Sequence, residues 1–316
     1  MVEVLTAGEI LVEIMRKEKD VALNVPGDFY GPFPSGAPAI FIDQVALLGH
    51  AAGIVGSVGK DEFGKQLLVR LDMDGVDISH IRVSEEYSTA VAFVSYKKDG
   101  SRRFIYHIGN AAAGQLEVPD QEFLRHVKVF HIMGCSLMSS ARVREIIINI
   151  AKMVSANGGI ISFDPNIRVE LLKGNDIAGI IGDIISITDI FMPGEGEFAS
   201  ISSLKSIDEA VEWAFSKGIR VIVIKMGKRG ARYIDSERDV TVKAIEVDEI
   251  DPTGAGDSFD AGFICGYLEG MSPEDSLRLA SVCGGLNAAF FGPMEGVFPR
   301  QFIEYYMKKD RDKNNG

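Results

Sequence analysis

Short runs of apolar residues alternate along the chain with longer amphipathic stretches. The apolar runs predict strands at Val2–Ala7, Gly53–Val58, Val127–Ile132, Ile160–Asp164, Ile187–Met192 and Val221–Lys225. The amphipathic stretches predict helices near Ala39–Leu48, Glu62–Asp74, Ser140–Asn157, Ile207–Lys217 and Asp257–Leu268. Several strands are nearly continuous apolar runs, as expected for strands that are covered on both faces. This alternation predicts a mostly parallel sheet with helices on both sides.

One region breaks the alternation. The β-rich segments Thr89–Tyr96 and Arg102–His107 flank an Asp99-Gly100 pair, which is typical of a hairpin turn. The segment Glu9–Asn24 is also strand-like. We therefore predict a small β-sheet beside the main one, with strands within about 9–35 and 88–110. Such an insertion often acts as a lid over a ligand.

Length and composition narrow the class of protein. The chain has 316 residues, of which 46% are hydrophobic, so it can build a sizeable core. A single core stops growing near roughly 250–300 residues, and we take residues 1–316 as one large α/β domain. The tail Lys308–Gly316 is polar and is expected to fray.

The charge excludes several kinds of partner. A formal net charge of -12 gives no broad electrostatic footprint for nucleic acid or an anionic membrane. A bound nucleotide would have to be held by local groups such as helix N-termini, a few lysines and a divalent cation. The segment Met1–Leu5 lacks the basic start of a signal peptide, and no apolar run reaches the ~18 residues of a membrane span. The protein is expected to be cytoplasmic.

The cysteines and histidines give no sign of a metal site. Cys135, Cys265 and Cys283 lie far apart in apolar runs, which predicts buried free thiols. The five histidines have no metal-ligand spacing, so a structural zinc site is not expected.

The most informative segment is DPTGAGD, residues 251–257, which lies between a strand-like run and a helical pattern. Gly254, Ala255 and Gly256 are small, so their backbone N–H groups can approach a ligand at a helix N-terminus, which favours anions. Asp257 falls in the first helical turn. A carboxylate there would repel a bound phosphate, but it suits a base that deprotonates an attacking hydroxyl. Taken alone, a small-residue turn before an aspartate is more often an ordinary helix start.

This segment resembles the C-terminal signature of the ribokinase-like (phosphofructokinase B type) carbohydrate kinases, D-T/x-x-G-A-G-D. Other motifs of that family follow in the same order, at Gly8–Glu13, Ser35–Gly49, Gly56–Gly64, Asp164–Arg168 and Lys225–Gly230. The resemblance covers nearly the whole chain. It implies a three-layer α/β/α domain with a mostly parallel central sheet and a small β-sheet lid. It also implies phosphate transfer from ATP to a sugar with Mg²⁺, and it leaves open a monovalent cation such as K⁺.

The resemblance assigns site residues position by position. It makes Asp257 the general base and Gly254, Ala255 and Gly256 the anion hole. The residues expected to bind the sugar are Glu13, at the end of a segment like the family's first strand, with Gly36, Ala37 and Arg168. The residues expected to bind the nucleotide are Lys225, Gly227, Gly230, Gly254 and Asn287. Glu197 is expected to order Mg²⁺ or phosphate through water.

The predicted lid adds a further candidate. Arg103 lies on it, and a cation there would suit the carboxylate of an acidic sugar. The branch of the family that phosphorylates 2-keto-3-deoxygluconate tends to carry Arg where this chain has His107. That departure favours a neutral ketose.

Other departures leave the identity of the sugar open. Glu13 stands where the family more usually has Asp, and Ser35 replaces the first glycine of a Gly-Gly pair. Ile40 replaces an Asn that contacts sugar hydroxyls, and Gly194 replaces the Asn of an N-x-x-E motif. The expected acceptor is a primary hydroxyl of a ketose of the fructose or tagatose type, or of 2-keto-3-deoxygluconate.

Two other functions remain open. One is a nucleoside kinase of the same fold, and the other is a sugar- or nucleotide-binding regulator that has lost catalysis. A dehydrogenase is disfavoured because no Gly-x-Gly-x-x-Gly follows the first strand. An exposed lid face could also pair two copies of the chain as a homodimer.

Overall fold

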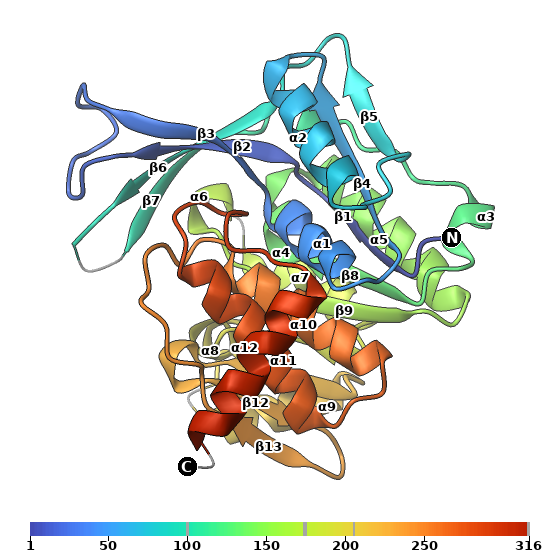
Figure 1. Ribbon diagram of the computed structural model, residues 1–316. Helices are drawn as coiled ribbons and strands as arrows, with labels where there is room; N and C mark the ends of the chain where they lie inside the picture. The colour runs from blue at the N-terminus through green and yellow to red at the C-terminus, as the bar shows by residue number, and fades with distance from the viewer. Residues whose placement is uncertain (99–100, 173–175, 205, 315–316) are drawn as a thin grey trace.

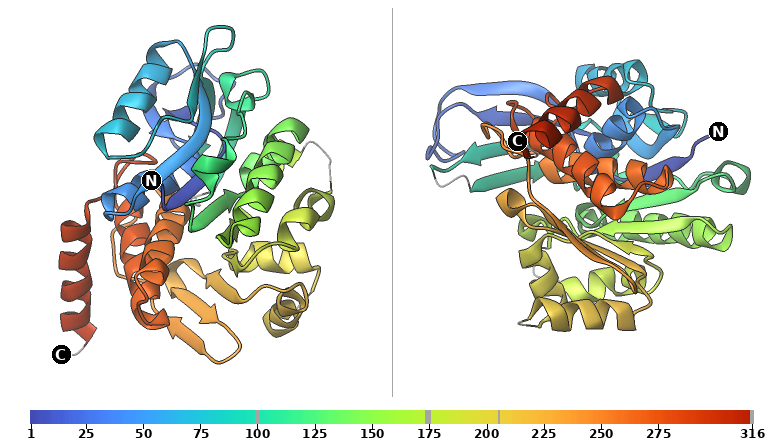
Figure 2. Two further views of the ribbon diagram at one scale, coloured as in Figure 1. Left: turned by 90° about the vertical axis from the view of Figure 1, so that its right-hand side faces the viewer. Right: turned by 60° about the horizontal axis from the view of Figure 1, so that its bottom comes forward.

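The main body of the molecule is a large sheet between two layers of helices (Figures 1 and 2). The structure, a computed structural model, describes residues 1–98, 101–172, 176–204 and 206–314. Within these ranges the main sheet has nine strands in the order β13-β12-β11-β10-β9-β8-β1-β4-β5. Neighbouring strands are parallel, except that β12 runs antiparallel to both β11 and β13. The predicted three-layer α/β/α architecture is confirmed.

All six predicted strands are present in the main sheet. The sheet comprises β1 (Val4–Ala7), β4 (Ala52–Gly59), β5 (Ile81–Ser84), β8 (Val129–Met133), β9 (Ile160–Asp164), β10 (Ile190–Phe191), β11 (Val221–Lys225), β12 (Ala231–Ile234) and β13 (Asp239–Val242). Every residue of β1, β4 and β8 is buried, which explains their continuous apolar runs. Sequence patterning missed β5, β12 and β13. Both edge strands, β5 and β13, are only partly buried, so their apolar signal is weak.

Helices cover both faces of this sheet (Figure 2). One layer contains α1 (Ala37–Leu47), α2 (Glu62–Met73), α10 (Ala255–Leu268), α11 (Pro273–Ala288) and α12 (Arg300–Asn314). The other contains α3 (Gln121–Leu124), α4 (Gly134–Ser139), α5 (Ala141–Ala156), α6 (Val169–Leu172), α7 (Ile177–Ile185), α8 (Glu195–Ser202) and α9 (Ile207–Ser216). Short 3₁₀ turns lie at η1 (Ala112–Gly114) and η2 (Gly227–Arg229). Among the described helices, none has the length and apolar character needed to cross a bilayer.

Helices α10 and α11 pack unusually closely. A Cβ atom at Gly262 would lie 2.7 Å from the Cα of Ala280, and one at Gly266 would lie 3.0 Å from the Cα of Ser276. Only glycine allows the two helix backbones to approach this far. The close contact fixes the position of the α10 N-terminus, which carries the DPTGAGD segment.

The C-terminal tail, which is expected to fray, has a helical backbone as far as Asn314. Helix α12 continues to that residue. Its first turn is anchored by Arg300, which pairs with Glu269 at 2.6 Å, and by Phe302, whose ring centroid lies 4.4 Å from that of Phe298. Once a helix is nucleated, each further residue adds a hydrogen bond at little cost, so the polar end stays helical.

A second, smaller sheet projects from the main body (Figure 1). It has the order β3-β2-β6-β7, with β2 (Leu11–Arg16), β3 (Phe29–Ser35), β6 (Ala90–Tyr96) and β7 (Arg102–His107). β2 and β6 are parallel, and the outer pairs are antiparallel. Glu13 therefore lies in β2 of this sheet and not in the first strand of the main sheet. The predicted Asp99-Gly100 turn lies outside the described residues.

Candidate active site

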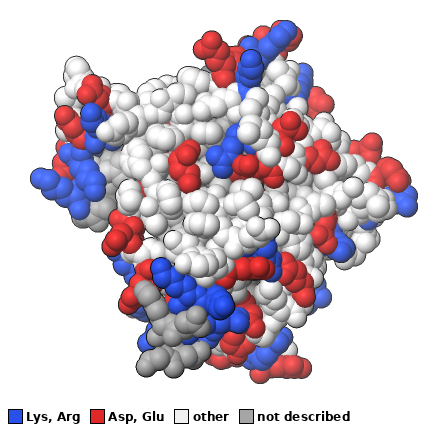
Figure 3. Space-filling view, viewed as in Figure 1, with Lys and Arg blue, Asp and Glu red and all other residues white. Residues whose placement is uncertain are grey.

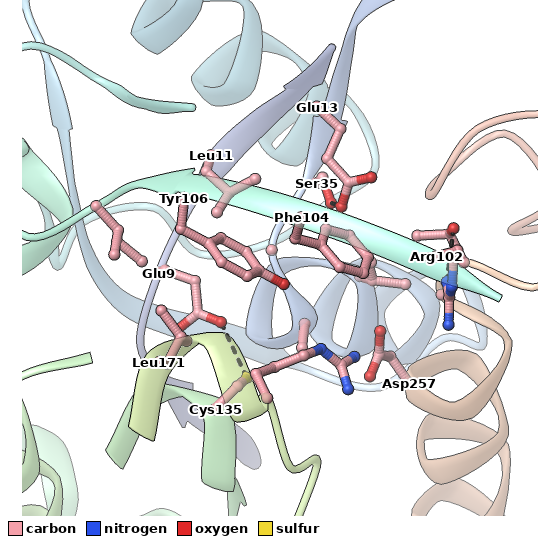
Figure 4. Close-up of a pocket in the computed structure, with 17 residues that line it drawn as sticks. Glu9, Leu11, Glu13, Ser35, Arg102, Phe104, Tyr106, Cys135, Leu171 and Asp257 are labelled. Atoms are coloured by element: carbon pink, nitrogen blue, oxygen red, sulfur yellow. Dashed lines mark hydrogen bonds between the residues drawn. The ribbon is translucent and has the colours of Figure 1, made fainter. Parts of the chain in front are cut away.

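Two cavities meet at the N-terminus of α10. The first, which we call the inner pocket, lies between the small sheet and the main body and has a volume of about 40 Å³ (Figure 4). The second, which we call the outer groove, has a volume of about 480 Å³. Gly254 and Asp257 line the inner pocket, whereas Ala255 and Gly256 line the outer groove. The first turn of α10 is thus the boundary that both cavities share.

The loop before α10 adopts a conformation that requires glycine. Gly254 has φ 81°, and a Cβ there would lie 2.3 Å from the carbonyl oxygen of Pro293. The carboxylate of Asp251 accepts hydrogen bonds from the Thr253 amide at 3.0 Å and the Gly292 amide at 3.2 Å. Of the three amides at the start of α10, that of Ala255 donates to the Pro252 carbonyl oxygen at 3.3 Å, and those of Gly254 and Gly256 make no backbone hydrogen bond within the described residues, which suits an anion site.

Asn287 also holds this loop, and it does not contact the nucleotide side as predicted. Its Nδ2 donates to the carbonyl oxygens of Thr253 at 2.9 Å and Pro293 at 3.2 Å. The side chain is fully buried and does not line the outer groove. An amide that satisfies two loop carbonyls in the core cannot also reach a base, so the assignment of Asn287 to the adenine side is corrected.

Asp257 faces the inner pocket (Figure 4) and is 5% exposed. It accepts a hydrogen bond from Asn166 Nδ2 at 2.9 Å. Burial raises the pKa of Asp257 to about 7, although the nearby Arg168 guanidinium opposes that rise. A carboxylate with a pKa near neutrality is well matched to general-base catalysis.

Glu13 and Ser35 form a pair on the wall of the inner pocket. Ser35 Oγ donates to Glu13 Oε1 at 2.7 Å, while Oε2 has no hydrogen-bond partner among the described residues. Burial raises the pKa of Glu13 to about 7. The two departures from the family pattern are thus linked, because the serine hydroxyl supplies a donor to the longer acid. Gly36 and Ala37, also predicted to lie at the substrate, line the same pocket.

Arg102, not Arg103, reaches the inner pocket. Along β7, Arg102, Phe104 and Tyr106 line the pocket, whereas Arg103 is exposed on the opposite face with His107. Successive side chains of a strand point to opposite faces, so an error of one residue reverses the assignment. Arg102 Nη1 also donates to Thr253 Oγ1 at 2.8 Å, which joins the small sheet to the loop before α10.

Arg168, which is predicted to bind the sugar, lines the inner pocket. Its neighbours include the side chains of Cys135, Tyr106 and Asp257, which outweigh the effect of burial and raise the pKa of its guanidinium. Arg168 therefore brings a permanent positive charge beside the candidate base.

Sequence reasoning missed Glu9, which also lines the inner pocket (Figure 4). Cys135 Sγ donates to its Oε1 at 3.0 Å, and Ser136 donates to its other oxygen. Burial raises the pKa of Glu9 above its ordinary value. A glutamate within an otherwise apolar segment, Gly8–Val12, was the signal that could have identified it.

The outer groove brings together Lys225, Gly227 and Gly230 with Gly256. Gly227 has φ 57° and Gly230 has φ 102°, and a Cβ at Gly230 would lie 1.9 Å from the Val242 carbonyl oxygen. Apolar side chains, among them those of Ile245, Val247 and Phe259, line the rest of the groove. An apolar slot that ends at small residues and a lysine can accept a flat base at one end and phosphates at the other.

Glu197, the predicted metal-side residue, caps helix α8. Its Oε1 accepts from the Ile167 amide at 2.7 Å, and its Oε2 accepts from the Gly194 amide at 2.8 Å. Burial raises the pKa of Glu197. In the part of the chain that the structure describes, no three carboxylate, histidine or cysteine groups converge on a metal position. A Mg²⁺ ion usually binds through substrate phosphates and retained waters, which these surroundings can accommodate.

Known proteins of similar sequence cover nearly the whole chain. The sequence profile described as "pfkB family carbohydrate kinase" matches residues 3–297. The chain is 30% identical to "Probable fructokinase-2" of Arabidopsis thaliana, over 93% of this chain and 92% of that protein. It is 28% identical to the 2-dehydro-3-deoxygluconokinase of Bacillus subtilis, over 88% of this chain and 87% of that protein.

Solved structures agree with this relationship. An E. coli protein described as a ribokinase II candidate superposes with a TM-score of 0.92 and 40% sequence identity, over 98% of this chain and 100% of that one. Three observations agree with one another: two cavities meet at the DPTGAGD helix, a sequence profile spans nearly the whole chain, and the fold is similar to that of the solved structure. The chain belongs to the pfkB family of carbohydrate kinases and is a sugar kinase.

Proposed function

We propose that the chain transfers the terminal phosphate of ATP to a primary hydroxyl of a sugar bound in the inner pocket. The observation that carries this proposal is the shared boundary at α10. Asp257 faces one cavity, and Gly256, its neighbour in sequence, faces the other. An acceptor and a nucleotide on the two sides would meet at the backbone amides of Gly254, Ala255 and Gly256.

The proposed reaction uses the geometry of that boundary. The carboxylate of Asp257 takes the proton of the acceptor hydroxyl, whose oxygen attacks the terminal phosphorus as the bond to the ADP oxygen breaks. The amides at the start of α10 stabilise the charge that develops on the transferred group. Mg²⁺, when bound, neutralises phosphate charge, and Glu197 is the candidate to order it through water.

A relative supports the choice of donor. The E. coli protein has also been solved with ATP and Mg²⁺, and in that form it superposes with a TM-score of 0.91 at 40% identity. In this chain the outer groove has the size and apolar lining expected for an adenine nucleotide. The monovalent cation stays a prediction.

The acceptor is proposed to be a ketose of the fructose or tagatose type or 2-keto-3-deoxygluconate. Carboxyl groups of Glu9 and Glu13 in the inner pocket suit sugar hydroxyls, and they favour the ketose. Arg102 and Arg168 line the same pocket, and two guanidinium groups suit an acidic sugar. The arginines therefore keep the keto acid as a second candidate.

The small sheet is proposed to act as a lid. The inner pocket, at about 40 Å³, is smaller than a hexose. Binding therefore requires β6 and β7 to move outward or the side chains of Arg102 and Phe104 to rotate, followed by closure over the sugar. Closure would exclude water and so limit hydrolysis of ATP.

The test is a phosphorylation screen of the purified chain with fructose, tagatose, 2-keto-3-deoxygluconate, ribose and adenosine, with ATP and Mg²⁺. The expected result is turnover of a ketose or of the keto acid, with ADP and sugar phosphate formed in equal amounts. Turnover of adenosine alone would favour a nucleoside kinase. Binding of sugar and ATP without product would favour a regulator.

A homodimer through the lid is proposed on the exposed face of the small sheet. Phe29 is 38% exposed and Ile105 is 48% exposed there, and the ring of Phe93 lies between Phe29 and His107. Figure 3 shows a mostly uncharged surface over this sheet, with both basic and acidic side chains at its left-hand end. Sedimentation should give a dimer for the unaltered chain and a monomer for Ile105→Glu. Val83→Glu, at a comparably exposed position on β5, is the matched control.

A further inference from the structure

Three buried ionisable side chains, those of Asp164, Lys225 and Asp260, form one set next to the first turns of α10. Lys225, at the end of β11, places its Nζ 2.8 Å from Asp164 Oδ2 and 2.9 Å from Asp260 Oδ2. Both carboxyl groups are almost fully buried, and the Lys225 side chain is 15% exposed. Asp164 ends β9 and Asp260 lies on α10, so three separate elements meet at this ammonium group.

On one side this set is hydrogen-bonded, through Asn166, to Asp257, the proposed base. Asn166 Nδ2 lies 3.2 Å from Asp164 Oδ2 and 2.9 Å from Asp257 Oδ1, so one amide group joins the two carboxyl groups. Asp260 follows Asp257 by three residues and therefore lies on the same side of the helix, about one turn later. The base and the lysine are thus held by one network.

On the other side the set reaches the outer groove. Lys225 lines the groove, and its Nζ is 3.9 Å from the position that a Cβ of Gly256 would occupy. Gly256 belongs to the small-residue turn that is proposed to bind the transferred phosphate. The ammonium group therefore lies beside that turn, at the end of the groove where phosphates would be.

The two carboxyl groups of this set differ in their pKa shifts. Burial raises the pKa of Asp260 well above its ordinary value. Burial acts in the same direction on Asp164, but Lys225 and a hydrogen bond with Asp260 outweigh it and lower the pKa of Asp164. Asp164 is therefore favoured as a carboxylate partner of the Lys225 ammonium, which offsets part of the cost of burying both charges.

Two other titratable groups face this set. His131 Nε2 lies 3.9 Å from Asp260 Oδ2, and burial lowers the pKa of His131 to about 3, so it stays uncharged. Glu197 acts on Lys225 through its charge and, with the two aspartates, raises the pKa of the ammonium despite burial. Lys225 therefore remains a cation throughout the neutral pH range.

We propose that Asp260 is a positioning residue for phosphoryl transfer, which, together with Asp164, fixes the Lys225 ammonium at the phosphate end of the outer groove. The proposal rests on the proposed function, because Lys225 would contact the phosphate that is transferred. A lysine has a flexible four-carbon stem, and without these partners its ammonium could pair directly with Asp257. Fixing the ammonium keeps the base free and the cation in place.

The test compares Asp260→Leu with Asp260→Asn in the full chain. Leucine removes the carboxyl group and keeps the branching of the side chain, whereas asparagine keeps an acceptor for Lys225 and a donor for Asp164. We expect Asp260→Leu to weaken ATP binding, measured by calorimetry with Mg²⁺, by about 10-fold, the lower range for a charged hydrogen bond. In the same variant, AMP binding and the KM for the sugar should change less than about twofold, whereas kcat should fall about 10-fold. Asp260→Asn should restore ATP binding and kcat to within about threefold of the unaltered chain.

Glu85→Leu is the matched control. Glu85 pairs with a lysine, Lys60, at 2.6 Å on the surface, where both side chains are exposed, and it lines neither cavity. Its removal should leave ATP binding and kcat within about twofold, since exposed ion pairs contribute little. An equal loss in this control would mean that the effect does not depend on the buried position of Asp260, and it would overturn the proposal.

Other outcomes are equally decisive. Unchanged ATP binding and kcat in Asp260→Leu would refute the positioning role, as would an equal loss of ATP and AMP binding. If the leucine variant does not fold, Asp260→Ser removes the carboxyl group without adding an apolar chain, and the same measurements apply. Failure of the unaltered chain to bind ATP would instead refute the proposed function.

Discussion

The inner pocket and the outer groove lie on either side of one helical turn, yet they are built in different ways. The inner pocket draws on segments far apart in the chain and gathers five carboxyl or guanidinium side chains, those of Glu9, Glu13, Arg102, Arg168 and Asp257. The outer groove comes from residues 225–288 and is lined largely by glycines and by alanine, isoleucine and valine side chains.

This difference assigns substrate selection to the inner pocket and nucleotide binding to the outer groove. Buried carboxyl groups with raised pKa values and buried groups of opposite charge discriminate strongly between ligands. Any ligand that fails to pair with them leaves a buried polar group unsatisfied. Backbone amides and apolar walls bind a nucleotide with less dependence on any single side chain. Substitutions should therefore have large effects in the inner pocket and, apart from Lys225 and its partners at the phosphate end, small effects along the outer groove.

The strongest test of this contrast is Asp257→Asn. It should lower kcat by about 10²–10⁴-fold, as loss of a general base does, while ATP binding stays within about twofold. Steady-state kinetics and calorimetry measure the two quantities separately. Asp248→Asn, an exposed aspartate near the groove, is the control that should change neither. Turnover close to that of the unaltered chain would remove Asp257 from the role of base.

The pH dependence of activity should come from the inner pocket alone. Asp257 must be deprotonated to act as a base, and its pKa of about 7 predicts that kcat/KM falls as pH drops below 7. From Asp257 alone the fall at pH 5 should be about 100-fold, since the active fraction drops tenfold for each pH unit. Glu13, with a pKa of about 7, should steepen this limb, and Glu13→Gln should restore a slope of one. A flat profile between pH 5 and 8 would contradict this assignment.

The stability of the free protein should depend on pH in the opposite direction. The pKa of Asp257 is about 7 in the folded chain against 3.8 ordinarily, so its contribution to stability is complete below about pH 4 and is lost as pH rises to about 7. Because one pKa unit corresponds to ~1.4 kcal/mol, the effect is at most about 4 kcal/mol. Asp257→Asn should therefore raise Tm relative to the unaltered chain at pH 8 but not at pH 4. Equal Tm differences at both pH values would show that burial does not raise the pKa of the Asp257 carboxyl group.

A matched pair on β7 tests which arginine serves the inner pocket. Arg102→Ala should raise the KM for the sugar by about 10-fold or more, because it removes a charged contact and the link to Thr253. Arg103→Ala, which truncates the exposed neighbour on the opposite face, should change KM less than about twofold. The reverse order of effects would show that β7 has a different register when sugar is bound.

The smallest effect is expected in the outer groove. Ile245 packs against Gly285 along the groove wall, and Ile245→Ala removes part of one apolar contact. A loss of about 1 kcal/mol should raise the KM for ATP about fivefold and leave kcat unchanged. A loss of 100-fold would mean that the groove, like the inner pocket, depends on individual side chains.

Local patterns predicted much of the fold and the central motif. Continuous apolar runs identified β1, β4, β8, β9 and β11 because strands buried on both faces need no polar positions. The edge strands β5 and β13 escaped notice because their solvent-facing positions are polar or exposed.

Residue roles were harder to predict than elements. Arg103 was predicted and Arg102 was not, because the phase of a strand's alternation is set by what packs against it, and the sequence alone does not show that partner. Asn287 was assigned to the nucleotide because its helix follows the anion loop. Its side chain turns into the core, where the Thr253 and Pro293 carbonyls need donors. Asp260 was overlooked, although an aspartate three residues after Asp257 on an apolar helix was a visible signal.

The amino-acid sequence by itself determined the α/β architecture, the small-residue turn at Gly254–Gly256 and the acid that follows it. These features are local, since they depend on periodicity and on backbone freedom within a few residues. Only the tertiary structure decided which distant side chains surround that acid, joining Glu13 to Ser35, Asn166 to Asp257 and Lys225 to Asp164. Such pairings depend on burial and on charge balance between strands and helices that meet only in the folded chain.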